Sequence, residues 1–430
     1  MALPADLPNL RHLEAFVEVY GRGSVNAAAA SIHLSQPAVT QAIAALEQWS
    51  GAQLFTRSHL GMTPTDAAVA CRRRIDRTLE MLREAIGERP GRRSRATGSA
   101  LRRITAAQLQ ALVAVVEHHG FSAAARQLGL ARPTLHRAAR ELEDRLGTAL
   151  FERTSFGVEP TRDAVEIARR LHLAFAELEQ ARAELSALAG TDRGGTVVGA
   201  MPLARTLLVP ASVLAFANAY PAHTVTILDG PYEGMLDALR RGAADLLIGA
   251  LRDPVPFADI VQEPLFEDPL ALVVRCGHPL AGRRRAKVGD LARFRWIAPR
   301  RGSPLRSRFD ALARAIGLED PEGLIECNSL VAARGMLLGS DRIMLLSAHQ
   351  VHHELASGQL ATLAHPFGAV TRTIGLTLRR DWQPTTAQSA LLDRLRQDAR
   401  ALTPTVRPRE PARNGRPRSA RRVPAAKRAR

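Results

Sequence analysis

Cysteine and lysine are scarce in this chain of 430 residues. Its three cysteines lie far apart, so they form neither a disulfide framework nor the paired spacing of a zinc site. We therefore expect Cys71, Cys276 and Cys327 to be buried, reduced thiols in a reducing compartment. An enzyme that binds its cofactor or substrate covalently through lysine would need a lysine in its cleft, and this chain has very few lysines.

Several targeting and catalytic patterns are also missing. No run of 18 apolar residues could form a membrane helix, and the N-terminus lacks the basic start and apolar run of a secretory signal. There is no glycine-rich phosphate loop and no G-x-S-x-G turn. We expect a cytoplasmic protein with no membrane contact, no metal and no cofactor.

The formal charge of +17 is concentrated at one end of the chain. Residues 1–190 carry 24 basic against 20 acidic side chains, and residues 191–402 carry 25 against 21. The last 28 residues carry ten against one, alternating with Pro, Ala and Gly. We expect this tail, residues 403–430, to be disordered and to bind polyanions without sequence preference.

The first 190 residues contain one unit twice. A shift of 96 residues aligns the chain with itself without a gap, so that Pro37 meets Pro133 and Gly51 meets Gly147. The pairs Leu54-Phe55 and Leu150-Phe151 also coincide. Registered Gly, Pro and Phe positions are not a property of alanine-rich helices in general, so we infer a duplicated domain.

Each copy has the pattern of a helix-turn-helix followed by a wing. An apolar helix (about 10–20 or 106–118) precedes a short alanine-rich helix, a tight turn and a third helix, Gln36–Trp49 or Arg132–Leu146. Two short strands around Gly61 or Gly157 would then form the wing. The alternative is an ordinary helical bundle with solvated faces.

The third helix of each copy is the candidate DNA reader. Its apolar face packs inward, which leaves the first turn and short polar side chains facing out, and Gln and Arg can pair with base edges in a major groove. In copy two the capping Ser35 is replaced by Ala131, which cannot accept a cap hydrogen bond. The candidate DNA-binding residues, with one arginine before each wing, are Ser35, Gln36, Pro37, Ala38, Thr40, Gln41, Arg57, Arg132, Pro133, Thr134, His136, Arg137, Arg140 and Arg153.

These motifs resemble a known family. The stretch from Leu10 to Ala68, with its Ser-Gln-Pro-Ala run and Leu-Phe-x-Arg sequence, resembles the N-terminal winged helix-turn-helix of LysR-type transcriptional regulators. That family generally carries one such domain, so the second copy is a departure. The resemblance implies that the long amphipathic helix 162–190 pairs with its mate in a homodimer or homotetramer; the alternative is that the helix packs on its own domain.

The remainder of the chain alternates strands and helices, which predicts an α/β domain with parallel strands in two lobes. Its sequence resembles the LysR effector-binding domain, which is similar to periplasmic solute-binding proteins. One tract also resembles a subgroup associated with galactose-type sugar regulation. The expected fold is therefore α+β and multidomain, with boundaries at 8–66 (winged helix-turn-helix copy 1), 67–88 (helix), 89–103 (flexible basic linker), 104–161 (copy 2), 162–190 (dimerisation helix) and 194–402 (two-lobed effector domain).

Ligands of such two-lobed domains bind where strands end and helices begin, because free backbone N–H groups gather there. We expect a sugar or small organic acid at this place, with Ser303 either binding it or merely capping its helix. The candidate effector-binding residues are Met201, Pro202, Leu203, Arg205, Ile248, Gly249, Ala250, Gly302, Ser303 and Pro304.

The sequence thus predicts a regulator that binds double-stranded DNA and responds to a small effector. The alternative is a solute-binding or enzymatic α/β domain whose DNA-binding modules serve localisation. We further predict that copy two, joined directly to the dimerisation helix, anchors the DNA complex, whereas copy one hangs on the flexible linker. The rival is that only copy one reads bases.

Overall fold

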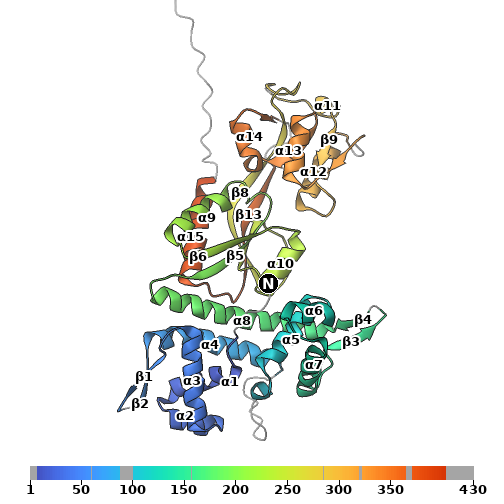
Figure 1. The fold of residues 1–430 in the computed structure, drawn as a ribbon. Coiled ribbons are helices and arrows are strands. Elements are labelled where there is room, and N and C mark those ends of the chain that lie inside the picture. The colour runs from blue at the N-terminus through green and yellow to red at the C-terminus, as the bar shows by residue number, and fades with distance from the viewer. Residues whose placement is uncertain are drawn as a thin grey trace, which may run out of the picture.

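The computed structural model describes residues 7–59, 61–87, 100–155, 157–283, 285–318, 322–364 and 370–402. Two winged-helix domains lie on one side of a long helix, α8, and a two-lobed domain lies on the other side (Figure 1). The predicted tail 403–430 and residues 89–99 of the predicted linker lie outside the described residues.

Both winged-helix domains have the predicted order of elements. The first consists of α1 (Leu10–Arg22), α2 (Val25–Ile32), α3 (Gln36–Ser50), β1 (Phe55–Ser58), β2 (Gly61–Pro64) and α4 (Asp66–Ala85). The second consists of α5 (Ala106–Glu117), α6 (Phe121–Leu128), α7 (Arg132–Leu146), β3 (Phe151–Thr154), β4 (Gly157–Pro160) and α8 (Arg162–Leu188).

Equivalent hydrogen bonds shape the two copies. Near the end of the third helix, the Glu47 carboxylate accepts the backbone N–H groups of Leu54 and Phe55 at 2.8 and 3.2 Å. Glu143 does the same in copy two, at 2.8 and 3.0 Å. Each carboxylate therefore fixes the angle at which the wing leaves its reading helix.

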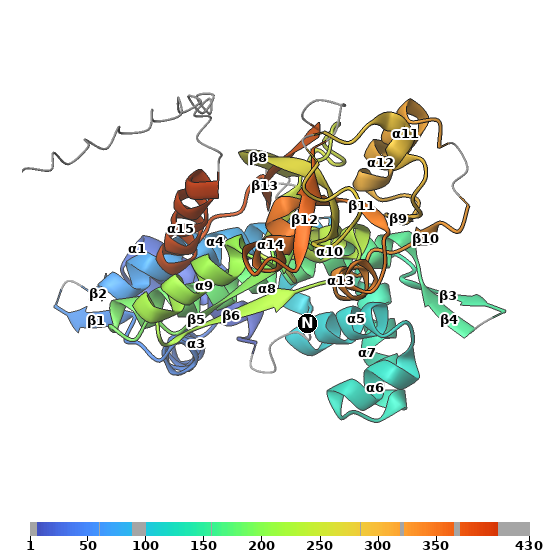
Figure 2. The same ribbon diagram turned by 90° about the horizontal axis from the view of Figure 1, so that it is seen from above.

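The long helix α8 packs along α4 of the same chain. Its pairing with a second subunit, which the sequence analysis expected, stays a prediction. The Thr78 hydroxyl donates to the backbone carbonyl of Ala174 at 3.2 Å, and one hydrophobic core spans α1 to α8. We call the two winged-helix domains, joined by α4 and α8, the two heads of a double-headed unit. The wings of the two heads lie at opposite ends of this unit in both views (Figures 1 and 2).

Residues 100–103, the described end of the predicted flexible linker 89–103, have regular structure. A short 3-10 helix, η1 (Ala100–Arg103), buries Leu101 in the shared core. Its Arg102 forms an ion pair with Glu14 at 2.8 Å and donates to the backbone carbonyl of Ile32 at 3.0 Å. Copy two is thus attached to copy one directly before α5.

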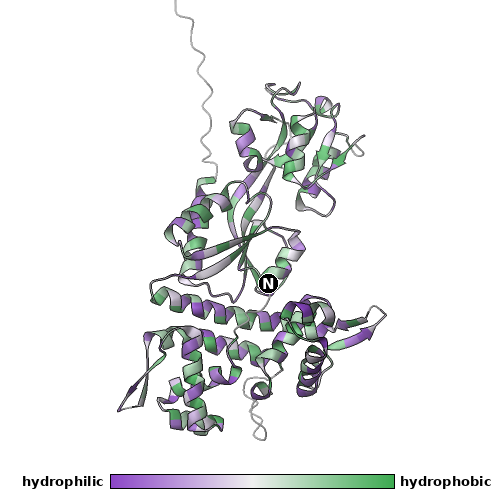
Figure 3. Cartoon of the chain, viewed as in Figure 1, coloured by the Kyte–Doolittle hydropathy of each residue, from purple (hydrophilic) through white to green (hydrophobic). Residues whose placement is uncertain are grey.

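The second half of the chain forms one mixed sheet whose strands run through two lobes. The order is β10-β9-β11-β8-β13-β7-β5-β6, with β12 paired to β8. Hydrophobic residues gather on these strands (Figure 3). The strands are β5 (Gly194–Ala200), β6 (His223–Leu228), β7 (Leu246–Ala250), β8 (Ile260–Arg275), β9 (Trp296–Ala298), β10 (Ile325–Glu326), β11 (Ile343–Ser347), β12 (Leu360–Leu363) and β13 (Val370–Arg379).

The expectation of parallel strands holds only in part. Strand β5 pairs in parallel with β6 and β7, and β9 pairs in parallel with β10 and β11. Strands β8, β12 and β13 are antiparallel to their neighbours, which the expectation of parallel strands did not include. The long pair β8 and β13 joins the two lobes.

Helices cover the sheet in each lobe. Residues 202–207 form turns after β5, and α9 begins at Leu208. No helix among the described residues is apolar over enough of its length to cross a membrane. The helices and one 3-10 turn are α9 (Leu208–Ala219), α10 (Tyr232–Arg240), α11 (Val288–Leu291), α12 (Pro304–Ala315), α13 (Leu330–Leu338), η2 (Ala348–Val351), α14 (His352–Ala356) and α15 (Thr386–Leu402).

Candidate DNA-reading helices and effector cleft

The first turns of α3 present polar groups to solvent. Ser35 caps the helix by accepting the Ala38 N–H at 3.3 Å. Gln36, Pro37 and Gln41 are exposed, and Thr40 is half-buried, as is Ala38. The exposed amides have no partner among the described residues, so their donors and acceptors are available to base edges.

Helix α7 presents cations at the equivalent positions and is mostly hydrophilic (Figure 3). Arg132, Arg137 and Arg140 are exposed, and none forms an ion pair within the described part of the chain. Pro133 and Thr134 are exposed beside them, and Ala131 makes no side-chain cap, as the sequence predicted. The wing arginines, Arg57 on β1 and Arg153 on β3, are also exposed.

His136 does not project freely, although the sequence analysis placed it on the outer face. Its ring stacks on Phe121 with centroids 3.8 Å apart. Burial, followed by the charges of Arg132 and Arg140, lowers the pKa of His136, which disfavours the charged ring. This imidazole supports the position of α7 more than it offers a charge to DNA.

A cavity of about 610 Å³ separates the two lobes of the α/β domain. Seven of the predicted effector residues line it: Met201, Pro202, Leu203, Arg205, Ala250, Gly302 and Ser303. They come from the turn after β5, the end of β7 and the turn before α12. The structure therefore brings together most of the residues that lie far apart in the sequence.

Three predicted residues do not line the cavity. Ile248 and Gly249 are buried inside β7, and Pro304 begins α12. Gly249 still matters for the cleft, because a Cβ atom there would lie 2.3 Å from Cγ of Met201. The absence of a side chain at Gly249 allows the Met201 turn to approach the sheet.

The Ser303 hydroxyl has an unusual environment. Ser303 stands at the N-cap of α12, but its side chain does not accept a hydrogen bond from the helix. Its oxygen is buried and has no hydrogen-bond partner among the described residues. The Ser303 side chain therefore does not cap α12, although the sequence analysis expected that it could.

The cleft has an excess of positive charge. Arg205 forms an ion pair with Asp229 at 2.8 Å, whereas Arg252 lies over the Tyr232 ring at 4.1 Å from its centroid and forms no ion pair with a described residue. The sequence analysis missed these cavity residues: some follow β6, β10 and β11 or lie on β13, and others lie just outside the three short stretches it selected. The missed polar residues are Asp229, Tyr232, Glu233, Arg252, Arg300, Arg301, Asn328, Ser329, Gln350 and Arg372.

A buried carboxylate holds the strands that cross between the lobes. Asp268 on β8 is fully buried and accepts from Ser347 at 2.5 Å, His349 at 3.0 Å and Arg372 at 2.9 Å. Burial raises the pKa of Asp268, but the His349 hydrogen bond, the charge of Arg372 and the Ser347 hydrogen bond outweigh it and lower the pKa below its usual value. Arg372 also lines the cavity, so the cleft touches this junction.

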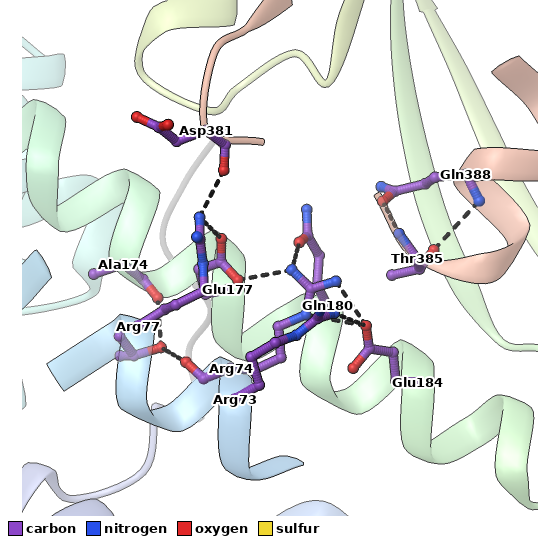
Figure 4. Close-up of polar contacts among 11 residues, drawn as sticks. Arg73, Arg74, Arg77, Ala174, Glu177, Gln180, Glu184, Asp381, Thr385 and Gln388 are labelled. Atoms are coloured by element: carbon purple, nitrogen blue, oxygen red, sulfur yellow. Dashed lines mark hydrogen bonds and ion pairs between the residues drawn. The ribbon is translucent and has the colours of Figure 1, made fainter. Parts of the chain in front are cut away.

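A second polar cluster connects the α/β domain to the paired helices (Figure 4). The Arg74 guanidinium, fully buried on α4, contacts Glu177 at 2.7 Å, Gln180 at 2.6 Å and Glu184 at 2.6 Å. The neighbouring Arg77 contacts Glu177 at 3.0 Å and donates to the backbone carbonyl of Asp381 at 2.8 Å. These residues thus join α4, α8 and the α/β domain.

One thiol matches the expectation of buried cysteines and two do not. Cys71 is buried on α4, and burial raises the pKa of its thiol to about 12. Cys276 is exposed and Cys327, which lines the cavity, is half-buried.

Comparisons with known proteins agree with this architecture. Residues 10–69 and 106–165 match the family "Bacterial regulatory helix-turn-helix protein, lysR family", and residues 189–400 match the "LysR substrate binding domain". The HTH-type transcriptional regulator GalR of Pseudomonas putida is 35% identical over 92% of this chain and 98% of its own length. GbpR of Azospirillum brasilense is 29% identical over 57% of this chain and 72% of its own.

A solved structure shows the same fold. A full-length OxyR variant from Pseudomonas aeruginosa matches with a TM-score of 0.50 at 23% identity, over 68% of this chain and 94% of its own. The family match decides between the two function classes that the sequence left open, in favour of a regulator rather than an enzyme. The chain belongs to the LysR family of DNA-binding transcriptional regulators, and it carries two helix-turn-helix domains and one effector-binding domain.

Proposed function

We propose that the cleft between the lobes binds a small organic anion and that this binding changes how α3 and α7 engage operator DNA. The observation that carries the effector site is the buried Ser303 hydroxyl without a partner in the described chain. A buried polar group that lacks a hydrogen bond costs about 1–3 kcal/mol. A ligand oxygen at this wall of the cleft would remove that cost.

The charge of the cleft supports an anion. Five arginines and two acidic residues line the cavity. Arg252 and Ser303 line both this cavity and a second one beside it, so the two groups face a common region. A guanidinium binds a carboxylate through two parallel, charge-assisted hydrogen bonds. A neutral sugar carries no negative charge and cannot form this ion pair. We therefore favour a carboxylic acid over a sugar.

We propose that the N-terminal ends of α3 and α7 enter major grooves, with the wing arginines on the flanking phosphates. Gln36 and Gln41 on α3, and Arg132 and Arg137 on α7, stand on the exposed first turns, where helix-turn-helix proteins contact bases. The exposed Arg57 and Arg153 are suited to phosphate contacts, which position a protein without reading sequence. A protein with this role acts in the cytoplasm, where the DNA is.

Coupling between the two sites has a physical route. Arg77 joins the α4 and α8 pair to the Asp381 carbonyl at the base of the α/β domain, and Arg240 and Arg169 contact Asp259 on the same side. An effector that favours one arrangement of the lobes would change these contacts. The winged-helix domains would then shift between positions relative to the α/β domain. A homodimer or homotetramer remains a prediction, and its contacts would lie outside the face that α4 covers.

Calorimetric titration of the full chain tests the effector site. The panel is aliphatic and aromatic mono- and dicarboxylates, with neutral hexoses for comparison. We expect an acid to bind, and Ser303→Ala to weaken it by about 1 kcal/mol, or roughly fivefold. Ser357→Ala, an exposed serine on the second lobe, is the matched control and should have no effect.

Two results would count against the proposal. Binding of a hexose with no binding of any acid would show that the arginines do not select an anion. Equal affinity of the wild type and Ser303→Ala for the same acid would make the role of Ser303 structural.

A further inference from the structure

We infer that a single chain reads both halves of its operator, with α3 on one half and α7 on the other, and that the two halves differ in sequence. The inference rests on the proposed reading role of α3 and α7. It concerns what a duplicated domain can do and a single copy cannot, namely supply two unlike DNA-reading helices within one chain.

The paired helices have an approximate two-fold axis within the chain. Thr78 contacts Ala174, and these two positions correspond exactly in the repeat, with the same shift of 96 residues. Residues before Thr78 contact residues after Ala174, as Arg74 with Glu177 and Glu184 shows, so the helices run in opposite directions. An axis therefore passes between Thr78 and Ala174 and exchanges the two heads.

The buried faces of α4 and α8 agree with that axis. Equivalent positions of the two copies are buried in the shared core, as in any two-fold pair of identical helices. The apolar faces of α4 and α8 thus cover each other within one chain and are not free to pack on a second subunit. The equivalent buried pairs are Ala68 and Ala164, Ile75 and Leu171, Leu79 and Phe175, Leu82 and Leu178, and Ala85 and Ala181.

Contacts outside the helix pair favour this arrangement within one chain. Leu101 of η1 lies in the shared core, and Arg102 bonds to α1 and to the end of α2. Copy two therefore begins on the surface of copy one. The attachment also raises the local concentration of one helix around the other far above that of a separate chain.

The two readers present different chemistry at equivalent positions. Gln36 corresponds to Arg132, and Gln41 corresponds to Arg137. Glutamine pairs with the N6 and N7 edge of adenine, whereas arginine pairs with O6 and N7 of guanine. A third difference, the exposed Ala44 against Arg140, adds a cation to α7 only. The half-sites that fit α3 and α7 are therefore unlike, and the operator has a direction.

Selection of binding sites from random duplex DNA tests the inference. We expect the wild-type chain to recover a site with two dissimilar halves. Gln41→Ala should remove sequence preference in one half and Arg137→Ala in the other, each with a roughly five- to hundred-fold loss of affinity for the wild-type site. Gln48→Ala, an exposed glutamine near the other end of α3, is the matched control and should change neither half.

A titration of the selected duplex at concentrations far above its dissociation constant adds the stoichiometry, which we expect to be one chain for each pair of half-sites. Circular dichroism of each variant confirms that its helices are intact.

The outcomes separate this inference from the role on which it rests. A palindrome, in which one variant weakens both halves and the other weakens none, would overturn the inference and leave sequence-specific reading in place. Saturation at two chains for one pair of half-sites would overturn it also. Recovery of no preferred sequence, with or without the carboxylic acids, would overturn the reading role itself and the inference with it.

Discussion

Arg74 occupies a place that a helix pair usually fills with an apolar side chain. The guanidinium is fully buried, and burial lowers its pKa, but the hydrogen bonds that it donates to Glu184 and Glu177 outweigh this effect and raise the pKa. The sequence run Arg72, Arg73, Arg74 gives no sign of which arginine is buried. Periodicity finds the apolar stripe of a helix, but it does not find a charge that carboxylates of a distant helix stabilise.

Removal of this guanidinium should destabilise the double-headed unit. Arg74→Leu leaves the buried Glu177 without its main partner, and loss of one member of a buried ion pair costs about 3–5 kcal/mol. Arg73→Leu is the control, since Arg73 is 60% exposed and lies 3.7 Å from Glu184, and it should change stability by about 0.5 kcal/mol or less. Urea unfolding followed by circular dichroism measures both. Equal midpoints for the two variants would show that α4 and α8 do not rely on this cluster.

Asp268 should make the stability of the α/β domain depend on acid pH. Its pKa is lowered in the folded chain, so its stabilising contribution is present above the ordinary carboxyl value of about 4 and is lost as the pH falls through the lower folded value. Asp268→Asn should therefore lower the melting temperature at pH 7, and the difference from wild type should shrink as the solution is acidified below pH 4. A difference that stays constant with pH would mean that the carboxylate charge is not what stabilises the junction.

At the scale of elements, the sequence predicts the winged-helix domains better than the α/β sheet. Caps and turn glycines mark each helix in the first half, and the repeat shows them twice. In the second half, Pro264 and Pro269 lie inside β8, and proline in a run argues against a strand because it lacks a ladder N–H. The register shift at Ile374 and Gly375 accommodates β13 beside that irregular segment, which local pattern cannot foresee.

The two wings offer a matched test of one element. Gly61 and Gly157 occupy equivalent turns with φ of +117° and +126°. A Cβ atom at Gly61 would lie 2.3 Å from the backbone oxygen of Gly23, which accepts the Met62 N–H, whereas one at Gly157 would meet nothing within 4 Å. Both alanine variants strain the backbone, but Gly61→Ala also forces two backbone segments apart and should cost about 1–3 kcal/mol more. Thermal unfolding of both variants decides this; an equal loss would refute the close contact between wing and α1.

For the whole molecule, the sequence predicts the domains and their order but not their partners. The apolar stripe of α8 is evident from its spacing, yet a stripe does not tell whether its partner is a second subunit or α4 of the same chain. The structure assigns α4, and with it the attachment of copy one. The predicted effector residues line only part of the cavity for a related reason: strand ends in the sequence indicate one wall, whereas the opposing groups depend on how β8 and β13 place the second lobe.

Pairing of the two heads within one chain is the claim on which the operator geometry depends, and an engineered disulfide tests it most directly. Thr78→Cys and Ala174→Cys would place two thiols at the point where α4 and α8 meet, in a chain whose three native cysteines are replaced by serine or alanine. The measurement is the mass of the oxidised species under denaturing, non-reducing conditions. We predict a crosslinked monomer, formed at the same rate when the protein is diluted. A covalent dimer of twice the chain mass, with a yield that rises with protein concentration, would contradict the account.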